Sequence, residues 1–491
     1  MFKPIGRFLF INTRMGQILA KNTFWLFLSE ILSRIFRMVL IIFAIRILGK
    51  EGWGLFSYTL SLVAIFMTFA DIGLSTLATR EASQENVQKN EYLSTVFYFK
   101  LFLLLATFFT IIIFAPFFIK LSGAQQLVPV IALLLFFDSL REFLFALNRA
   151  TQKIEREGLV KIGTNALIVG FGFYFLITSP SPLHFAWAYL LGSMLGTFWL
   201  MILIRKVFKK LWLHFSKEKI RVVWQSAWPV LVVGLFGDIM LNIDTVMLGW
   251  WHTFGEIGLY TAAQRLILLA YMIPGIFALT LFPLFAQLVS TNKKKFTLLL
   301  EKSMIWLFLF GLPVVAGGMI FRQEIILLVF GQGYAEASTV FALLLLTILV
   351  IFPNIVLVQG IYAYNLQKKF ITPTVVGLLL NIIFNIVLIP RVGIEAVAVT
   401  TFISQSIIVS WNWIKFNKIN SFVVFPFMRK IALALVLMSL LAIILQNIGI
   451  YFILNIALSA IFYFGMLYAL KEPLLKDLQT IFKPNPPISN I

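Results

Sequence analysis

Long runs of apolar residues recur along the whole chain of 491 residues, and they constrain its fold more than any other feature. Hydrophobic residues make up 60% of the chain and charged residues only 12%, whereas soluble domains have about 45–50% and about 25%. Soluble cores could not bury so much apolar side chain. We therefore predict an all-α polytopic membrane protein, whose helices each need about 20 mostly apolar residues to cross the bilayer.

The apolar runs give fourteen candidate spans, with ends that are uncertain by a few residues. They comprise residues 22–47, 53–78, 93–119, 127–148, 158–178, 183–205, 224–250, 256–288, 298–321, 337–363, 371–390, 395–414, 429–447 and 450–470. The connectors between them are short, and none is long enough to fold as a soluble catalytic domain. The basic, polar-interrupted residues 1–21 do not have the pattern of a cleavable signal. We expect a transport protein rather than an enzyme.

The distribution of Lys and Arg predicts the orientation of these spans. If the N-terminus is cytoplasmic, thirty of the forty Lys and Arg lie in cytoplasmic segments and five in outer loops. This alternation follows the rule that cytoplasmic loops carry the positive charge. It predicts a multi-pass protein of the cytoplasmic membrane with both termini in the cytoplasm. Because topology accounts for most of the net charge of +20, we expect membrane lipids as partners and no nucleic acid.

The chain also repeats itself at an offset of about 204–217 residues. Gly54-Leu55-Phe56-Ser57 opens the second predicted span and Gly258-Leu259-Tyr260-Thr261 opens the eighth. Spans one to six therefore look duplicated as spans seven to twelve, and an even number gives both halves the same orientation. We predict an N-terminal lobe at 1–210, a basic cytoplasmic linker at 211–223 and a C-terminal lobe at 224–418. Residues 419–491 then hold spans thirteen and fourteen and a cytoplasmic tail.

Ionisable residues inside the predicted spans are the candidates for function. A charged side chain at the centre of a membrane helix costs about 2.5–3.5 kcal/mol, so it usually faces a partner or a hydrated cavity. The three charges of span one share one helix face, because they lie four and three residues apart. The candidates are Glu30, Arg34 and Arg37 in span one, Asp71 in span two, Asp138, Arg141 and Glu142 in span four, Asp238 and Asp244 in span seven, and Arg265 in span eight.

Two interpretations of these charges remain open from the sequence. In the functional one, Arg34, Arg37, Arg141 and Arg265 line a hydrated cavity and bind an anionic group, since a guanidinium donates two parallel hydrogen bonds to phosphate. In the structural one, the arginines only neutralise acids of their own or neighbouring helices. The acids themselves, Glu30, Asp71, Asp138, Glu142, Asp238 and Asp244, are candidates for lining the cavity or coupling transport to an ion.

The residue composition indicates neither a metal site nor a bound cofactor. The chain has no Cys, so it has no disulfide, thiolate zinc site or Cys nucleophile. Its three His residues, His184, His214 and His252, lie in loops or near span ends without the spacing of metal ligands.

Several stretches, in their order and spacing, resemble one family of membrane proteins. They are Leu48-Gly49-Lys50-Glu51-Gly52-Trp53-Gly54, Phe69-Ala70-Asp71-Ile72-Gly73-Leu74, Thr79-Arg80-Glu81-Ala82, Asn242-Ile243-Asp244-Thr245-Val246-Met247-Leu248-Gly249, Gly258-Leu259-Tyr260-Thr261-Ala262-Ala263-Gln264-Arg265-Leu266 and Phe282-Pro283. Together with the fourteen spans, they resemble the O-antigen (Wzx-type) oligosaccharide flippases. These flippases belong to the polysaccharide transporter branch of the multidrug/oligosaccharidyl-lipid/polysaccharide (MOP) exporter superfamily. The similarity extends over about residues 20–420.

The resemblance implies a MATE-like fold and a flippase for cell-surface polysaccharide assembly. Such a flippase moves a polyprenyl-diphosphate-linked oligosaccharide across the cytoplasmic membrane by alternating access. It implies that a cationic cavity takes the diphosphate, that H⁺ or Na⁺ gradients are candidate energy sources, and that other membrane proteins of polysaccharide assembly are candidate partners. A lipid II flippase and a cation-coupled drug antiporter of the MATE type are the alternatives, although the latter usually has twelve spans and an acidic cavity.

Overall fold

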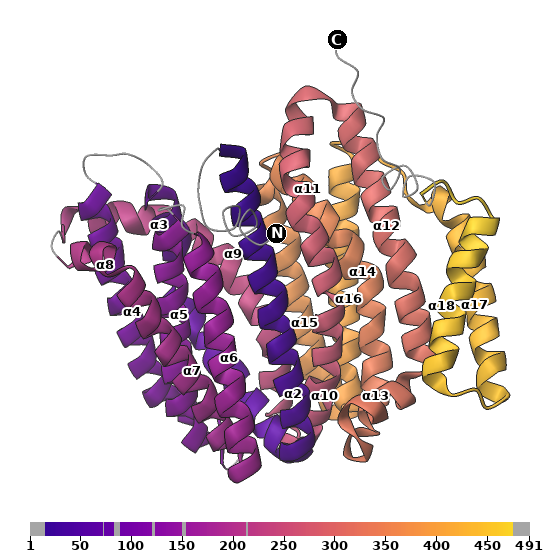
Figure 1. Ribbon diagram of the computed structural model, residues 1–491, viewed down its shortest axis with the longest axis horizontal. Coiled ribbons are helices and arrows are strands. Elements are labelled where there is room, and N and C mark those ends of the chain that lie inside the picture. The colour runs from indigo at the N-terminus through magenta and orange to yellow at the C-terminus, as the bar shows by residue number, and fades with distance from the viewer. Residues whose placement is uncertain are drawn as a thin grey trace, which may run out of the picture. The chain divides into compact units, whose positions relative to one another are not determined.

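The computed structural model describes residues 15–71, 73–82, 89–119, 123–149, 154–212 and 215–474. These residues are almost entirely helical, and no β-strand occurs among them (Figure 1). The chain divides into two compact units, residues 1–258 and 259–491. An all-α architecture is therefore confirmed.

The first unit contains eight α-helices, one 3₁₀ helix and the start of α10 within the described residues. Its elements are α2 (Met15–Met67), η1 (Thr68–Ala70), α3 (Leu74–Ala82), α4 (Lys89–Phe118), α5 (Ala124–Arg149), α6 (Ile154–Thr178), α7 (Pro182–Leu203), α8 (Arg205–Leu211) and α9 (Glu218–Leu248), and α10 (Phe254–Ala270) begins in it. Helix α6 packs against both α2 and α7, and α7 packs against α5. The predicted linker at 211–223 contains the end of α8 and the start of α9.

Predicted spans one and two both begin within α2. Gly49 turns the chain between them with φ 66° and ψ 177°, a conformation that other residues rarely adopt. The second span is not continuous, because α2 ends at Met67 and η1 and α3 follow it. Between η1 and α3 lie Asp71 and Gly73, the latter with φ 79°. The chain is therefore broken close to one of the predicted acidic residues.

The two copies of the repeated glycine motif touch each other in the first unit. A methyl group at Gly54 would lie 1.7 Å from the carbonyl oxygen of Phe254, four residues before Gly258. A methyl group at Gly258 would lie 2.0 Å from the carbonyl oxygen of Lys50, four residues before Gly54. The contact is thus reciprocal. Only glycine allows the two backbones to approach so closely.

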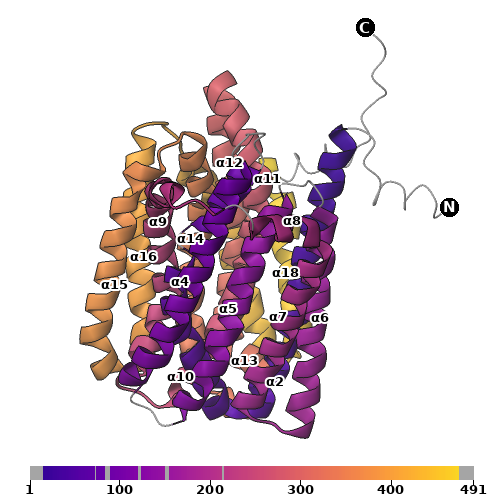
Figure 2. The ribbon, with the colours of Figure 1, turned by 90° about the vertical axis from the view of Figure 1, so that its left-hand side faces the viewer.

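The second unit contains the remaining helices. They are the rest of α10, then α11 (Met272–Thr291), α12 (Lys293–Ile320), α13 (Arg322–Phe330), η2 (Gln332–Tyr334), α14 (Ala337–Ala363), η3 (Gln367–Phe370), α15 (Ile371–Val392), α16 (Ile394–Asn417), η4 (Phe425–Met428), α17 (Arg429–Asn447) and α18 (Phe452–Ala469). Helix α14 packs against α11, α12 and α16. Helices α17 and α18 form a hairpin against α12 (Figure 1). The Tyr463 hydroxyl donates to the Leu309 carbonyl at 3.0 Å. Helices α15 and α16 also pack against each other and lie side by side in the turned view (Figure 2).

Ten helical segments among the described residues are long and apolar enough to cross a membrane. They correspond to ten of the fourteen predicted spans, so the chain is a multi-pass membrane protein. The other four, 22–47, 53–78, 127–148 and 224–250, are largely helical but carry most of the intramembrane charges. The count of fourteen stays a prediction. So do the lobe boundaries drawn from the repeat, although α9 clusters with the first unit.

Candidate functional site

The site is built on the contact between α2 and α6, which glycines bring close together. A methyl group at Gly158 of α6 would lie 3.3 Å from the Trp25 ring, and one at Gly172 would lie 2.5 Å from Leu40 of α2. The two helices therefore approach each other at two levels, 14 residues apart on α6. Polar side chains between these levels can reach across from one helix to the other.

Glu30 joins cations from both helices. Arg34, one turn further along α2, donates from Nε to Glu30 Oε1 at 2.6 Å. Lys161 of α6 donates from Nζ to the other carboxylate oxygen, Oε2. All three side chains remain accessible, with exposed fractions of 47% for Arg34, 31% for Glu30 and 32% for Lys161. This cluster is both paired and open to solvent or ligand.

Arg37 lies one turn beyond Arg34 and has a neutral partner. Its Nε donates to Oδ1 of Asn165, a buried residue of α6. Asn165 is fixed in turn, because its Nδ2 donates to the Lys161 carbonyl at 2.7 Å. The charge of Arg37 also interacts with the carboxylate of Asp138 on α5. Arg37 therefore connects the accessible cluster with the next group of charges.

Arg141 is buried and fully engaged within the first unit. Its Nη1 donates to the Ser193 hydroxyl at 2.6 Å and to the Ser193 carbonyl at 3.2 Å, and its Nη2 donates to Asp138. The Ser193 hydroxyl donates to the same Asp138 carboxylate. Only 6% of the Arg141 side chain is exposed. This arrangement locks α5 to α7 and matches the structural interpretation of Arg141.

Glu142, next to Arg141 on α5, points to an accessible position. Its charge interacts with those of Arg141, Lys161 and Arg149, and also with that of Glu157 on α6. Arg149 and Glu157 form their own ion pair with N–O distances of 2.6 and 2.9 Å. Glu142 therefore interacts electrostatically with both the buried Arg141 and the accessible Lys161.

A second group surrounds the break between η1 and α3. Lys100 of α4 is completely buried and donates to the Ser139 hydroxyl at 2.7 Å, and its Nζ lies 3.1 Å from Asp71 Oδ2. Asp71 also accepts from the backbone NH and the hydroxyl of Ser75, at 3.1 and 2.7 Å. Three groups thus satisfy this carboxylate. These contacts match the structural interpretation of Asp71, at the break before α3.

The two acids of α9 have different surroundings. Asp238 is exposed and accepts a hydrogen bond from the Thr68 hydroxyl at 3.1 Å, and its charge interacts with the like charge of Asp71. It forms no salt bridge with the described residues. Asp244, in contrast, is buried, with 2% of its surface exposed. The two residues are six positions apart, which places them on different faces of the helix and agrees with this difference.

Arg265 lies on α10 in the second unit and is partly buried. The first unit therefore contains three of the four predicted arginines and all six predicted acids. The assignment of Arg265 to a shared cavity stays a prediction.

Sequence reasoning missed four residues that complete the site. Lys100 lies inside predicted span three but has no charged neighbour at helical spacing within that span, and Lys161 lies so close to the start of span five that it is interpreted as one of the cytoplasmic cations. Asn165 and Ser193 carry no charge and were not considered for this role. The i, i+4 spacing identifies the Glu30–Arg34 pair within one helix. The contacts that residues of α6 and α7 make with other helices depend on how the helices pack, which residue spacing does not predict.

The network contains equal numbers of acidic and basic side chains, five of each. Its acids are Glu30, Asp71, Asp138, Glu142 and Asp238, and its cations are Arg34, Arg37, Lys100, Arg141 and Lys161. It is therefore not a uniformly cationic surface. The accessible positive charge is concentrated at Arg34 and Lys161, where one carboxylate faces two cations.

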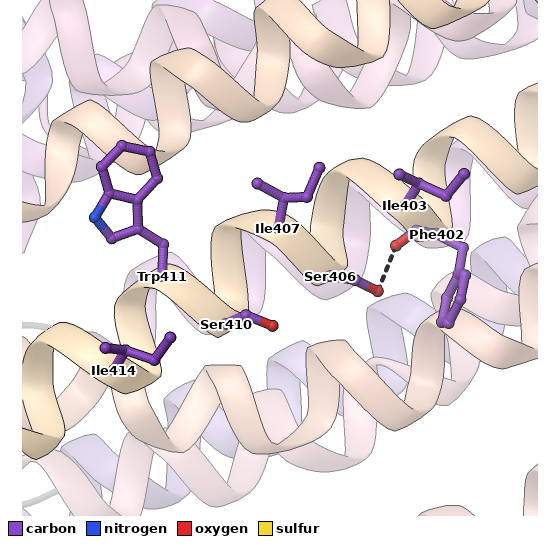
Figure 3. A pocket seen from close by; sticks show the side chains of 7 residues that line it. All are labelled: Phe402, Ile403, Ser406, Ile407, Ser410, Trp411 and Ile414. Atoms are coloured by element: carbon purple, nitrogen blue, oxygen red, sulfur yellow. Dashed lines mark hydrogen bonds between the residues drawn. The ribbon is translucent and has the colours of Figure 1, made fainter.

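An apolar hollow of about 620 Å³ lies elsewhere, along α16 in the second unit (Figure 3). Its lining includes Ile403, Ile407 and Trp411, with Ser406 and Ser410 as the polar members. The Ser406 hydroxyl donates to the Phe402 carbonyl of its own helix at 2.7 Å, so it is already satisfied. None of the predicted charged residues lines this hollow.

Comparison with solved structures identifies the fold. The chain resembles the lipid II flippase MurJ in an inward closed conformation, with a TM-score of 0.74 and 18% identity, over 91% of this chain and all of that one. It also resembles an inward-facing multidrug resistance MATE family transporter of the MOP superfamily, with a TM-score of 0.64 and 16% identity, over 79% and 95% of the two chains. These similarities confirm the predicted MATE/MOP-like fold.

Comparison of sequences identifies the family. The chain is 23% identical over 392 residues to a Haloferax volcanii protein named "probable low-salt glycan biosynthesis flippase Agl15". The aligned region covers 79% of this chain and 81% of that protein. The profile of the family described as "polysaccharide biosynthesis protein" matches residues 19–289, more than half of the chain. The protein is therefore a member of the polysaccharide biosynthesis protein family.

Proposed function

We propose that this protein is a flippase that moves a polyprenyl-diphosphate-linked oligosaccharide across the cytoplasmic membrane by alternating access, for the assembly of cell-surface polysaccharide. Both termini are cytoplasmic in this proposal, and the protein performs no covalent chemistry. Family membership and the name of the Haloferax volcanii relative support a glycan-linked substrate.

The observation that carries the proposal is the accessible guanidinium of Arg34 within an apolar helix. Nearly half of this side chain is exposed, although the surrounding stretch of α2 is predicted to lie in the membrane. An exposed charge at that depth requires water or an anionic ligand, because lipid cannot solvate it. A guanidinium binds phosphate oxygens through paired hydrogen bonds. A diphosphate headgroup has the charge and the acceptors that such a residue needs.

Coupling to H⁺ or Na⁺ is part of the proposal, and Asp238 is the acid best suited to it. It is exposed and has a single hydroxyl donor, whereas Asp71 has three donors and Asp138 is tied to Arg141. A carboxylate near a like charge gains most from taking up a proton or a monovalent cation.

The test is reconstituted flipping of a defined polyprenyl-diphosphate glycan in liposomes, with and without H⁺ and Na⁺ gradients. We expect wild-type protein to move the lipid, and Arg34→Gln to lose at least tenfold in rate while remaining folded. A matched control is Arg322→Gln, which removes an exposed arginine at the start of α13. Absence of flipping by the wild-type protein under all gradients would contradict the proposal.

A lipid II flippase is the second candidate, favoured by the structural similarity to MurJ. A lipid II flippase differs from the proposed oligosaccharide flippase in the glycan that its substrate carries, whereas both substrates contain a diphosphate. Parallel flipping assays with lipid II and with a lipid-linked oligosaccharide lacking the peptide distinguish the two. Transport of an organic cation without movement of either lipid would instead indicate a drug antiporter.

A further inference from the structure

The Glu30 carboxylate lies between two cations that come from different helices. One oxygen accepts from the Arg34 guanidinium and the other from the Lys161 ammonium. A phosphate group presents its oxygens in a similar way, as several acceptors on one small anionic centre. The protein's own carboxylate therefore occupies the position between a guanidinium and an ammonium where a phosphate would bind.

Most of the donor capacity of this pair remains unused. An arginine has five N–H donors and a lysine has three. Glu30 engages one nitrogen of Arg34, and the two terminal nitrogens of that guanidinium make no hydrogen bond to the described residues. Lys161 donates one hydrogen bond within the same set. A ligand with more acceptor atoms than one carboxylate would therefore be held more strongly.

The energetics favour exchange over a permanent ion pair. Pairs that remain exposed to this extent contribute only about 0–1 kcal/mol, because solvent screens them. Arg141 differs, since its partners Asp138 and Ser193 enclose it almost completely. Glu30 thus partly neutralises the charges of Arg34 and Lys161 through ion pairs that are weak enough for another anion to displace. A diphosphate with two negative charges gains more from the same cations than one carboxylate does.

The position of the cluster along the spans fits an entry site. Lys161 lies six residues after Glu155, where the candidate span of α6 begins, which is about 9 Å along the helix. In the predicted orientation this end faces the cytoplasm, where the lipid-linked substrate is made. Arg37 lies one turn deeper on α2 and is available as the next cation.

We propose that Glu30 is an exchangeable counter-ion which the diphosphate of the substrate displaces, and that Lys161 binds this diphosphate together with Arg34. This inference rests on the proposed flippase function and assigns Lys161 and Glu30 to it. Displacement also has a consequence for release. The freed carboxylate competes with the diphosphate for the same two cations, so it accelerates departure of the substrate as well as weakening its binding.

The experiment is calorimetric titration of the purified full-length protein in detergent with inorganic diphosphate. Glu30→Gln keeps the shape of the side chain but removes the competing charge, and we expect it to bind diphosphate about tenfold more tightly. Arg34→Gln and Lys161→Gln should each bind about tenfold more weakly. Glu51→Gln, at the exposed position after the Gly49 turn, and Arg322→Gln are matched controls and should equal the wild type.

The outcomes separate the inference from the proposed function. Unchanged or weaker diphosphate binding by Glu30→Gln overturns the inference, even if the wild-type protein flips its lipid in liposomes. Tighter binding by Glu30→Gln with no flipping by the wild type supports the anion site and contradicts the flippase proposal. Gel filtration shows whether Lys161→Gln yields folded protein. If it does not, Glu30→Gln alone decides whether Glu30 is a counter-ion. Lys161→Arg, which we expect to retain diphosphate binding, then tests the role of the lysine.

A second arm distinguishes a diphosphate site from one for ordinary anionic lipid. The titration is repeated in nanodiscs of neutral lipid with and without phosphatidylglycerol. Diphosphate binding that is equal in both supports the inference. Complete loss of binding when phosphatidylglycerol is present shows that membrane headgroups occupy the site and overturns it.

Discussion

Arg34 and Arg141 are the same residue type in comparable stretches of sequence, yet the structure gives them different surroundings. Arg34 has an exposed fraction of 47% and one carboxylate partner, while Arg141 is buried among Asp138 and two groups of Ser193. Spacing along the helix predicts an acid within one turn of each. It does not indicate which arginine a neighbouring helix covers, because that depends on packing between distant segments.

Substitution of the two arginines should separate stability from transport. Arg141→Gln leaves Asp138 without its buried counter-charge, and breaking such a pair costs about 3–5 kcal/mol. Arg34→Gln removes only an exposed pair, so it should leave the melting temperature nearly unchanged while lowering the flipping rate at least tenfold. Thermal unfolding in detergent, followed by intrinsic fluorescence, measures the difference. Equal melting temperatures for both variants would contradict the structural role of Arg141.

Lys100 offers a test of the second charge group. The side chain is completely buried against Asp71 and Ser139. Lys100→Met should destabilise the protein by about 3–5 kcal/mol, because it leaves the Asp71 charge uncompensated. The double variant Lys100→Met/Asp71→Asn removes both charges and should recover part of that loss. A double variant no more stable than Lys100→Met alone would show that the two residues act independently.

At the scale of helices, the sequence predicts which segments are helical better than it predicts where a helix is interrupted. The ten apolar segments are recognised correctly by length and composition. Span two is predicted as one helix over 53–78, but it breaks after Met67 at a turn that contains Gly73. Lys161 lies only three residues after the predicted start of span five at residue 158, where a Lys is interpreted as marking the cytoplasmic end of a span. The helix begins at Ile154 instead, so Lys161 lies two turns inside it.

The reciprocal glycine contact between α2 and α10 makes a specific prediction. Gly54→Ala and Gly258→Ala each place a methyl group against a carbonyl oxygen, at 1.7 and 2.0 Å, and backbone atoms cannot rotate away as side chains do. Each should lower the melting temperature and the transport rate, with a destabilisation of about 1–3 kcal/mol or more. Gly237→Ala in α9 is the control, since nothing lies within 4 Å of its methyl position. Unaltered stability of both variants would show that the helices are free to separate.

At the scale of the whole chain, the span count and orientation can be measured directly. The chain has no Cys, so single introduced cysteines can be labelled without background. Lys293→Cys and Arg391→Cys both lie at exposed positions. In the predicted topology a membrane-impermeant maleimide reaches Arg391→Cys from outside intact cells, whereas Lys293→Cys reacts only after the cells are opened. Labelling of both from the same side would exclude the predicted arrangement of spans.

The ion pair between Glu30 and Lys161 has a consequence for how the protein is made. The two residues are separated by 131 positions, so Arg34 and Glu30 leave the ribosome well before the lysine of α6 exists. The first span must therefore enter the membrane with its charges only partly compensated, by Arg34 and Glu30 themselves. Its final placement is completed when α6 arrives. Biosynthesis of this chain is thus order-dependent: a charged helix comes first, and its ion pairs are completed only when α6 follows.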